Sequence, residues 1–133
     1  MRLDSLTDYT VVAVKGIYYL PEESDPAVSP EAIELIFKES GSLDLTSGTD
    51  WTLRIEKGDW PKLPKWCYPP DEWAYRDIPA LSSEVLGKIH AVDKQVNGYG
   101  DLVQIELQFE GGSRIVAASG ESLTVTFTSA DKD

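Results

Sequence analysis

Two stretches of the chain, residues 33–55 and 105–127, alternate apolar and polar positions and align without a gap at an offset of 72. Seven of the 23 aligned pairs are identical, namely Ile33/Ile105, Glu34/Glu106, Leu35/Leu107, Phe37/Phe109, Ser47/Ser119, Gly48/Gly120 and Thr52/Thr124. Other pairs, such as Trp51/Leu123, keep an apolar residue. A period of two predicts half-buried strands, and the Gly- and Ser-rich segments between them are typical of turns. Each copy is therefore predicted to be a three-stranded antiparallel meander.

A further strand is expected before each meander. The segments "LTDYTVVAVKGIYYL" and "LSSEVLGKIHAVDKQ" align loosely at an offset of 75, which pairs Val11 with Leu86 and Val14 with Ile89. The second strand is predicted to enter its meander through a hairpin, with Asn97-Gly98 supplying positive φ. The corresponding connection in the first half, "PEESDPAVSPE", is long and broken by proline, which predicts a surface loop.

Neither half can bury its apolar face alone, because a small sheet with one apolar face needs a cover. We therefore predict a mainly β fold with little helix, in which two pseudo-repeats (about 6–56 and 81–128) form a sandwich or a barrel-like roll. The prediction treats residues 1–133 as a single domain. Glu34 and Glu106 occupy matched positions on the polar faces, where they are expected to face solvent.

Residues 57–80 form a crossover between the two copies. The stretch 57–81 contains five prolines and three of the four tryptophans, which predicts an extended or turning chain that is neither a helix nor a central strand. One interpretation is that the crossover wraps an edge of the sheets and its rings plug the open end of the core. The other is a partly exposed surface that combines aromatic and acidic side chains.

The charge is strongly one-sided, with 23 acidic against 12 basic residues and a net charge of −11. Such a surface disfavours nucleic acid and anionic membranes, and it favours association with a basic partner. The single cysteine, Cys67, excludes an internal disulfide and fits a reducing compartment. We see no signal-peptide pattern and no apolar run long enough to span a membrane, so we expect a cytoplasmic protein.

The residues that could carry catalysis or bind a metal are few. His90 lies in the middle of a predicted strand, and Cys67 has no base beside it in the sequence. The segment from Asp93 to Gln104 has the spacing of a calcium loop, but its twelfth position is glutamine instead of a bidentate carboxylate, and a hairpin turn accounts for its glycine. We predict a binding protein that is not an enzyme and has no cofactor and no metal.

The predicted binding residues combine carboxylates with large rings, the composition that favours protein interfaces. They lie in the first connection and in the crossover: Tyr19, Glu22, Glu23, Asp25, Trp66, Asp71, Glu72, Trp73, Tyr75 and Asp77. The crossover part of this set falls largely in the segment "CYPPDEWAYRD".

A small, acidic, disulfide-free β-rich chain with such a segment resembles the immunity proteins of bacterial polymorphic-toxin and contact-dependent inhibition systems. The resemblance implies binding to a cognate toxin domain, often a basic nuclease, and inhibition of that toxin. Two alternatives stay open. A carbohydrate-binding or carbohydrate-active β domain would show coplanar exposed tryptophans, and a structural or assembly domain would show an apolar patch that forms a homodimer.

Overall fold

The computed structural model describes residues 6–7, 9–19, 30–39, 41–48, 50–78, 87–121 and 123–128. Nine strands form one antiparallel sheet, and helical structure in the described residues is limited to short 3-10 turns such as η2 (Pro70–Glu72). The strands are β1 (Thr10–Tyr19), β2 (Ala32–Phe37), β3 (Ser42–Ser47), β4 (Leu53–Lys57), β5 (Trp73–Asp77), β6 (Gly87–Val96), β7 (Leu102–Phe109), β8 (Arg114–Ala118) and β9 (Thr124–Thr128). Within these residues, no helix has the length and apolarity needed to cross a membrane. The predicted mainly β fold is confirmed.

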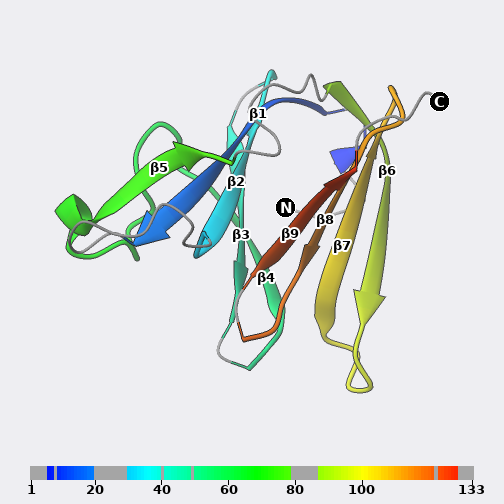
Figure 1. The fold of residues 1–133 in the computed structure, drawn as a ribbon. Coiled ribbons are helices and arrows are strands. Elements are labelled where there is room, and N and C mark those ends of the chain that lie inside the picture. Colours follow the sequence, from blue (N-terminus) through cyan, green and yellow to red (C-terminus); the bar gives the residue numbers. More distant parts are fainter. Residues whose placement is uncertain are drawn as a thin grey trace.

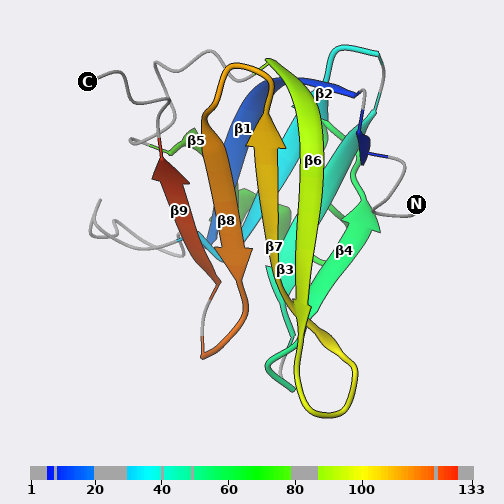
Figure 2. The ribbon, with the colours of Figure 1, turned by 90° about the vertical axis from the view of Figure 1, so that its right-hand side faces the viewer.

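The strand order is β4-β3-β2-β1-β6-β7-β8-β9, so that two four-stranded meanders meet where β1 pairs with β6. The sheet is open, with β4 and β9 at its ends. Figure 1 shows the two meanders facing each other at an angle, and Figure 2 shows β6–β9 in front of β1–β4. The predicted duplication of antiparallel meanders is therefore present in the strand pairing.

The first strand of each copy aligns differently from the sequence-based expectation. Val11 pairs with Phe37 in the first half and Ile89 pairs with Phe109 in the second, and a bulge follows at the next pair in both. Since Phe37 and Phe109 are 72 residues apart and Val11 and Ile89 are 78 apart, the offset of the first strands is 78 and not 75. The loose alignment failed because the connection that follows each first strand differs in length.

One apolar core lies between the two halves. It takes side chains from both copies at the positions that the alternation placed inward, including Ile33, Leu35, Phe37, Leu43, Leu45, Ile105, Leu107, Phe109, Ile115 and Leu123. Their period of two is a consequence of the β pleat, which turns successive side chains to opposite faces. Each half therefore covers the apolar face of the other.

Two turns depart from the expectations. The β6–β7 hairpin has its positive φ at Gly100 (85°), while Asn97 closes the turn by accepting hydrogen bonds at Oδ1 from the N–H groups of Tyr99 and Asp101. Trp51, expected in a strand, lies instead in the turn before β4 with a φ of 64° and 58% of its surface exposed. Its counterpart Leu123 is 4% exposed. The two copies thus differ where the last strand of each meander begins.

The crossover covers the outer face, which we define as the face of β1–β3 turned away from β6–β9 (Figure 1). Strand β5, which the proline content did not predict, pairs only with the end of β1, from Lys15 to Tyr19. A small second core forms beneath the crossover from Ile17, Ala32 and Cys67, with Leu63, Trp73 and Tyr75 packed against it. As a result every residue of β2 is buried. The prediction that Glu34 faces solvent is wrong.

Candidate functional site

Two carboxylic acids lie buried side by side on the outer face. Glu34 in β2 and Asp44 in β3 are direct partners in the antiparallel register, and their exposed fractions are 0% and 2%. Acidic residues directly opposite each other in a sheet repel when both are ionised, and burial makes this repulsion stronger. We call Glu34 and Asp44 the carboxyl pair; the arrangement is stable only if a proton or several hydrogen-bond donors compensate its charge.

The donors converge on Glu34. Tyr75 donates from its hydroxyl to Glu34 Oε1 at 2.5 Å, and the backbone N–H of Trp60 donates to Oε2 at 3.1 Å. The Ser42 hydroxyl also donates to Oε2. Two of these three donors belong to the crossover, so Glu34 fastens the crossover to the sheet.

The surroundings of Asp44 favour its protonated form. Its Oδ1 is buried and has no hydrogen-bond partner among the described residues. Burial, followed by the hydrogen bond and the charge of Glu34, raises the pKa of Asp44 to about 8, and Glu56 and Asp59 act in the same direction. The neutral form of Asp44 is therefore favoured in the folded protein, which relieves its repulsion from Glu34.

The crossover approaches the carboxyl pair so closely that only glycine fits at residue 58. The N–H of Gly58 donates to the carbonyl of Ser42 at 2.9 Å. A Cβ at Gly58 would lie under 3.0 Å from Glu34 Oε2, Ser42 Oγ and Asp44 Oδ1. The backbone of Gly58 therefore covers the carboxyl pair.

Two other titratable groups beneath the crossover are held neutral by the same surroundings. Burial, followed by the charges of Asp44 and Glu34, raises the pKa of Cys67 to about 12. Burial, followed by the hydrogen bond and charge of Glu34, raises the pKa of Tyr75. The thiolate is the nucleophilic form of cysteine, so Cys67 is a structural residue and is not an activated nucleophile.

A hollow of about 560 Å³ opens next to the crossover, and we call it the aromatic hollow. Its volume is within the range of small-ligand sites. It is lined by the end of β3 and the following turn, by β4, by a residue before β2 and by the crossover: Glu31, Thr46, Ser47, Gly48, Arg54, Glu56, Trp66 and Trp73.

The rings of the hollow belong to a cluster that continues to the end of β1. Trp66 and Trp73 meet edge to face at 5.3 Å with an interplanar angle of 90°, and Tyr19 lies 4.9 Å from Trp73. The Tyr19 hydroxyl donates to Glu72 at 3.1 Å. Trp66 and Tyr19 each keep 40% of their surface exposed. The ring cluster (Tyr19, Trp66 and Trp73) is thus both packed and accessible.

The charges in the hollow are unbalanced. Arg54 packs against Gly48, and its Nη2 lies 3.9 Å from Asp50 Oδ1, outside the set of lining residues. Within the described part of the chain, neither Glu31 nor Glu56 has an ion-pair partner. The two glutamates therefore give the hollow a negative field that a cation would neutralise.

The structure brings together some of the residues predicted to bind a partner and separates others. Tyr19, Trp66, Glu72 and Trp73 contact one another, with Asp71 exposed beside them. Tyr75 instead points inward to Glu34, and Asp77 pairs with Lys15 at 2.5 Å. Glu22, Glu23 and Asp25 lie outside the described residues. No group of three or more His, Cys, Asp or Glu in the described ranges is arranged to hold a metal ion.

The sequence-based prediction did not identify the carboxyl pair or the lining residues of β3 and β4. A signal for the pair was present in the first meander. Once β2 and β3 are expected to form a hairpin, the register that opposes Ile33 and Leu45 also opposes Glu34 and Asp44. Two acidic side chains that face each other on one side of a sheet repel, so their pairing indicates that a further group compensates their charge.

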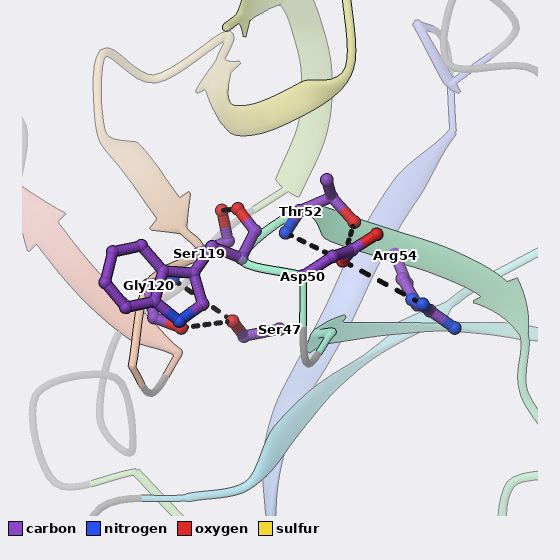
Figure 3. Close-up of polar contacts among 7 residues, drawn as sticks. Ser47, Asp50, Thr52, Arg54, Ser119 and Gly120 are labelled. Atoms are coloured by element: carbon purple, nitrogen blue, oxygen red, sulfur yellow. Dashed lines mark hydrogen bonds and ion pairs between the residues drawn. The ribbon is translucent and has the colours of Figure 1, made fainter.

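The edge of the hollow is also where the two copies of the repeat touch (Figure 3). Ser47 Oγ donates to the carbonyl of Gly120 at 2.9 Å and accepts from the N–H of Gly120 at 3.1 Å. In the other direction, the Ser119 hydroxyl lies 2.7 Å from the carbonyl of Trp51. The Ser-Gly identity of the repeat therefore coincides with a polar contact between the halves.

That contact holds Trp51 in a left-handed conformation, which costs a residue other than glycine about 1–2 kcal/mol. We expect Trp51→Gly to be more stable than Trp51→Ala by about 1 kcal/mol, because only glycine relieves this strain and both variants remove the same exposed ring. Urea denaturation of the two variants measures the difference. Equal stabilities would show that the backbone of residue 51 is not strained.

This region combines exposed rings with carboxylates that have no ion-pair partner among the described residues, and it is packed firmly on the sheet. Such an arrangement is suited to recognition of a cationic surface. Family models, curated proteins and solved structures were all compared with this chain, and none of them matched it.

Proposed function

We propose that this chain is a cytoplasmic binding protein that recognises a basic protein, as an immunity protein does when it neutralises a toxin. The contact is made by the exposed surface of the crossover, which we call the crossover face. The observation that carries the proposal is the ring cluster of Tyr19, Trp66 and Trp73, which is partly exposed and lies beside Asp71 and Glu72. Exposed rings that form a contiguous patch indicate a binding site, whereas single exposed rings do not.

In this proposal the rings anchor the partner protein and the carboxylates attract it. Partly buried tryptophan and tyrosine side chains supply most of the binding energy in protein interfaces. The surrounding carboxylates and the net charge of −11 accelerate the approach of a positive partner and select against negative ones. A nuclease active site is positive because it holds phosphate, so such a toxin domain is a fitting partner.

The ring geometry favours this proposal over a flat sugar-binding platform. Stacking of successive sugar rings would need tryptophans in one plane, and Trp66 and Trp73 are perpendicular. A perpendicular pair makes a corner that fits a single side chain inserted from a partner.

The test is rescue of cells by co-expression. Cells that produce a toxic basic domain encoded by the neighbouring reading frame should survive when this protein is produced with it, and the two purified proteins should form a complex. Survival without a complex, or a complex that forms without protecting the cells, would contradict the proposed inhibition.

Charge reversal locates the binding surface. We expect the double variant Asp71→Lys, Glu72→Lys to slow association with the basic partner by about ten-fold or more at low salt and to reduce the salt dependence of the rate. Stopped-flow or surface-based kinetics at two salt concentrations measure both effects. The double variant Asp101→Lys, Glu110→Lys changes the net charge by the same amount at exposed residues of two other turns, and it is the matched control. An equal effect of both charge changes would show that only net charge matters.

A further inference from the structure

We propose that the aromatic hollow is a receptor for one arginine side chain, which a protein partner inserts between Trp66, Trp73 and the two glutamates Glu31 and Glu56. This inference rests on the proposed function, since it names the chemical group that the binding surface takes up. It is narrower, because the surface could bind a basic protein without using the hollow.

The first argument is charge. Glu31 and Glu56 line the hollow from two different elements and have no ion-pair partner in the described ranges. Arg54 is the one cation among the described lining residues, and its Nη2 lies 3.9 Å from Asp50 Oδ1. A guanidinium entering the hollow would therefore meet uncompensated negative charge, and its planar fork of N–H groups can bind a carboxylate with two hydrogen bonds.

The second argument is the shape and chemistry of the wall. A guanidinium is weakly hydrated and stacks on the face of an indole, where the ring quadrupole attracts the positive charge. Trp66 and Trp73 stand at 90° to each other, so a flat group that stacks on one ring in the corner between them turns its own edge toward the face of the other ring. This corner discriminates in favour of a flat cation over a compact, strongly hydrated ammonium.

The third argument is that the hollow is already formed in the free protein. Arg54 is packed against Gly48, and Trp73 is held between Trp66 and Tyr19. Behind the wall, the carboxyl pair fastens the crossover through Tyr75 and Trp60. A preformed site loses less conformational entropy on binding than one that must be assembled.

The experiment uses Nα-acetyl-arginine amide as the probe and follows the indole N–H signals of the whole protein by NMR. We expect saturable shifts of the Trp66 and Trp73 signals in the millimolar range. The neutral isostere Nα-acetyl-citrulline amide should give none, and the lysine analogue should bind more weakly than the arginine probe. Equal shifts with citrulline, or shifts centred on tryptophans outside the hollow, would overturn the inference.

Two single substitutions in the lining should act in opposite directions. Glu56→Gln is expected to weaken arginine binding by about two- to five-fold, because it removes one carboxylate and keeps the shape. Arg54→Gln is expected to strengthen binding by a similar factor, because it removes the competing cation. Glu110→Gln, far from the hollow, should change neither. A uniform response of all three variants would mean that the probe senses only the overall negative charge.

The result also separates this inference from the proposed function. If the arginine probe does not enter the hollow and the protein still rescues cells and binds the basic domain, the hollow is not an arginine receptor and the binding surface lies elsewhere on the crossover face. If the probe binds as expected and no rescue occurs, the hollow recognises arginine in a protein other than a toxin.

Discussion

Gly58→Ala is expected to lower the free energy of unfolding by about 2–3 kcal/mol, because a methyl group at this position would overlap three buried oxygen atoms. Glu34 Oε2, Ser42 Oγ and Asp44 Oδ1 would all lie under 3.0 Å from the new Cβ. Glu34 Oε2 and Ser42 Oγ cannot move away without breaking the hydrogen bond between them or the bonds that the N–H of Trp60 donates to them. Overpacking and the loss of such a bond each cost about 1–3 kcal/mol.

Gly111→Ala is the matched control. Nothing lies within 4 Å of a Cβ built at Gly111, and its φ is not positive, so alanine should be neutral there or stabilise the fold slightly. Urea denaturation compares the two variants, and the tryptophan fluorescence, to which Trp60, Trp66 and Trp73 of the crossover contribute, follows the crossover during unfolding. If both substitutions changed stability by the same small amount, the crossover would not be packed on the carboxyl pair.

Asp44→Asn is expected to destabilise the protein at pH 4 and to stabilise it at pH 9, relative to the unchanged chain. Asparagine resembles the protonated acid and can donate one N–H to Glu34, but its second N–H has no partner and costs about 1–3 kcal/mol. This cost is independent of pH. The benefit depends on pH, because asparagine cannot ionise.

The sign follows from the pKa of Asp44, which is 3.8 for an accessible side chain and about 8 in the folded protein. Between these values the folded state holds a proton that the unfolded state has released. The contribution of Asp44 to stability is therefore complete below about pH 4 and is lost as the pH rises to about 8, with a slope of about 1.4 kcal/mol per pH unit. The difference between the variant and the unchanged chain should follow this slope and then level off.

Denaturation curves at several pH values between 4 and 9 test this expectation, with Asp101→Asn as an exposed control. The control should shift stability little and without the steep pH dependence. Parallel pH profiles for Asp44→Asn and the unchanged chain would mean that Asp44 is ionised in the folded protein. In that case the carboxyl pair would carry two charges and would need a cation to stabilise it.

The alternation of residues was sufficient to predict most of the strands and the side chains of the main core. Ile33, Leu35 and Phe37 and their copies Ile105, Leu107 and Phe109 all lie between the two halves. A period of two is a local property of the extended backbone, so a short stretch of sequence contains it completely. The duplicated meanders were predictable for the same reason.

The turns were less predictable, because the same residue types allow several backbone geometries. Asn97 and Gly98 indicated a hairpin, and the hairpin is present, but its positive φ lies at Gly100. Trp51 continued an apolar alternation and yet lies in a strained turn. A polar contact with Ser119, 68 residues away, holds this turn, and no local pattern records such a partner.

The candidate site depended on tertiary structure more than on any motif. Composition alone indicated that the crossover residues Trp66, Glu72 and Trp73 are suited to binding, and the structure brings them together with Tyr19. It adds Arg54 and Glu56 from β4, whose alternation indicated only an outward-facing strand. Tyr75 has the composition of a binding residue, but it serves the interior.

The two copies of Ile-Glu-Leu differ in a property that the sequence did not determine, namely the surroundings of their glutamates. By itself the sequence determined that both glutamates lie opposite the main core, since each stands between two inward apolar residues. Only the tertiary structure decided their surroundings: Glu106 keeps 23% of its side chain exposed and pairs with Arg114 at 3.4 Å, whereas Glu34 is fully buried. The physical reason is that alternation distinguishes the two faces of a strand, but it does not show whether the face opposite the main core is exposed or buried. That depends on what packs on it. The crossover lies over one copy alone.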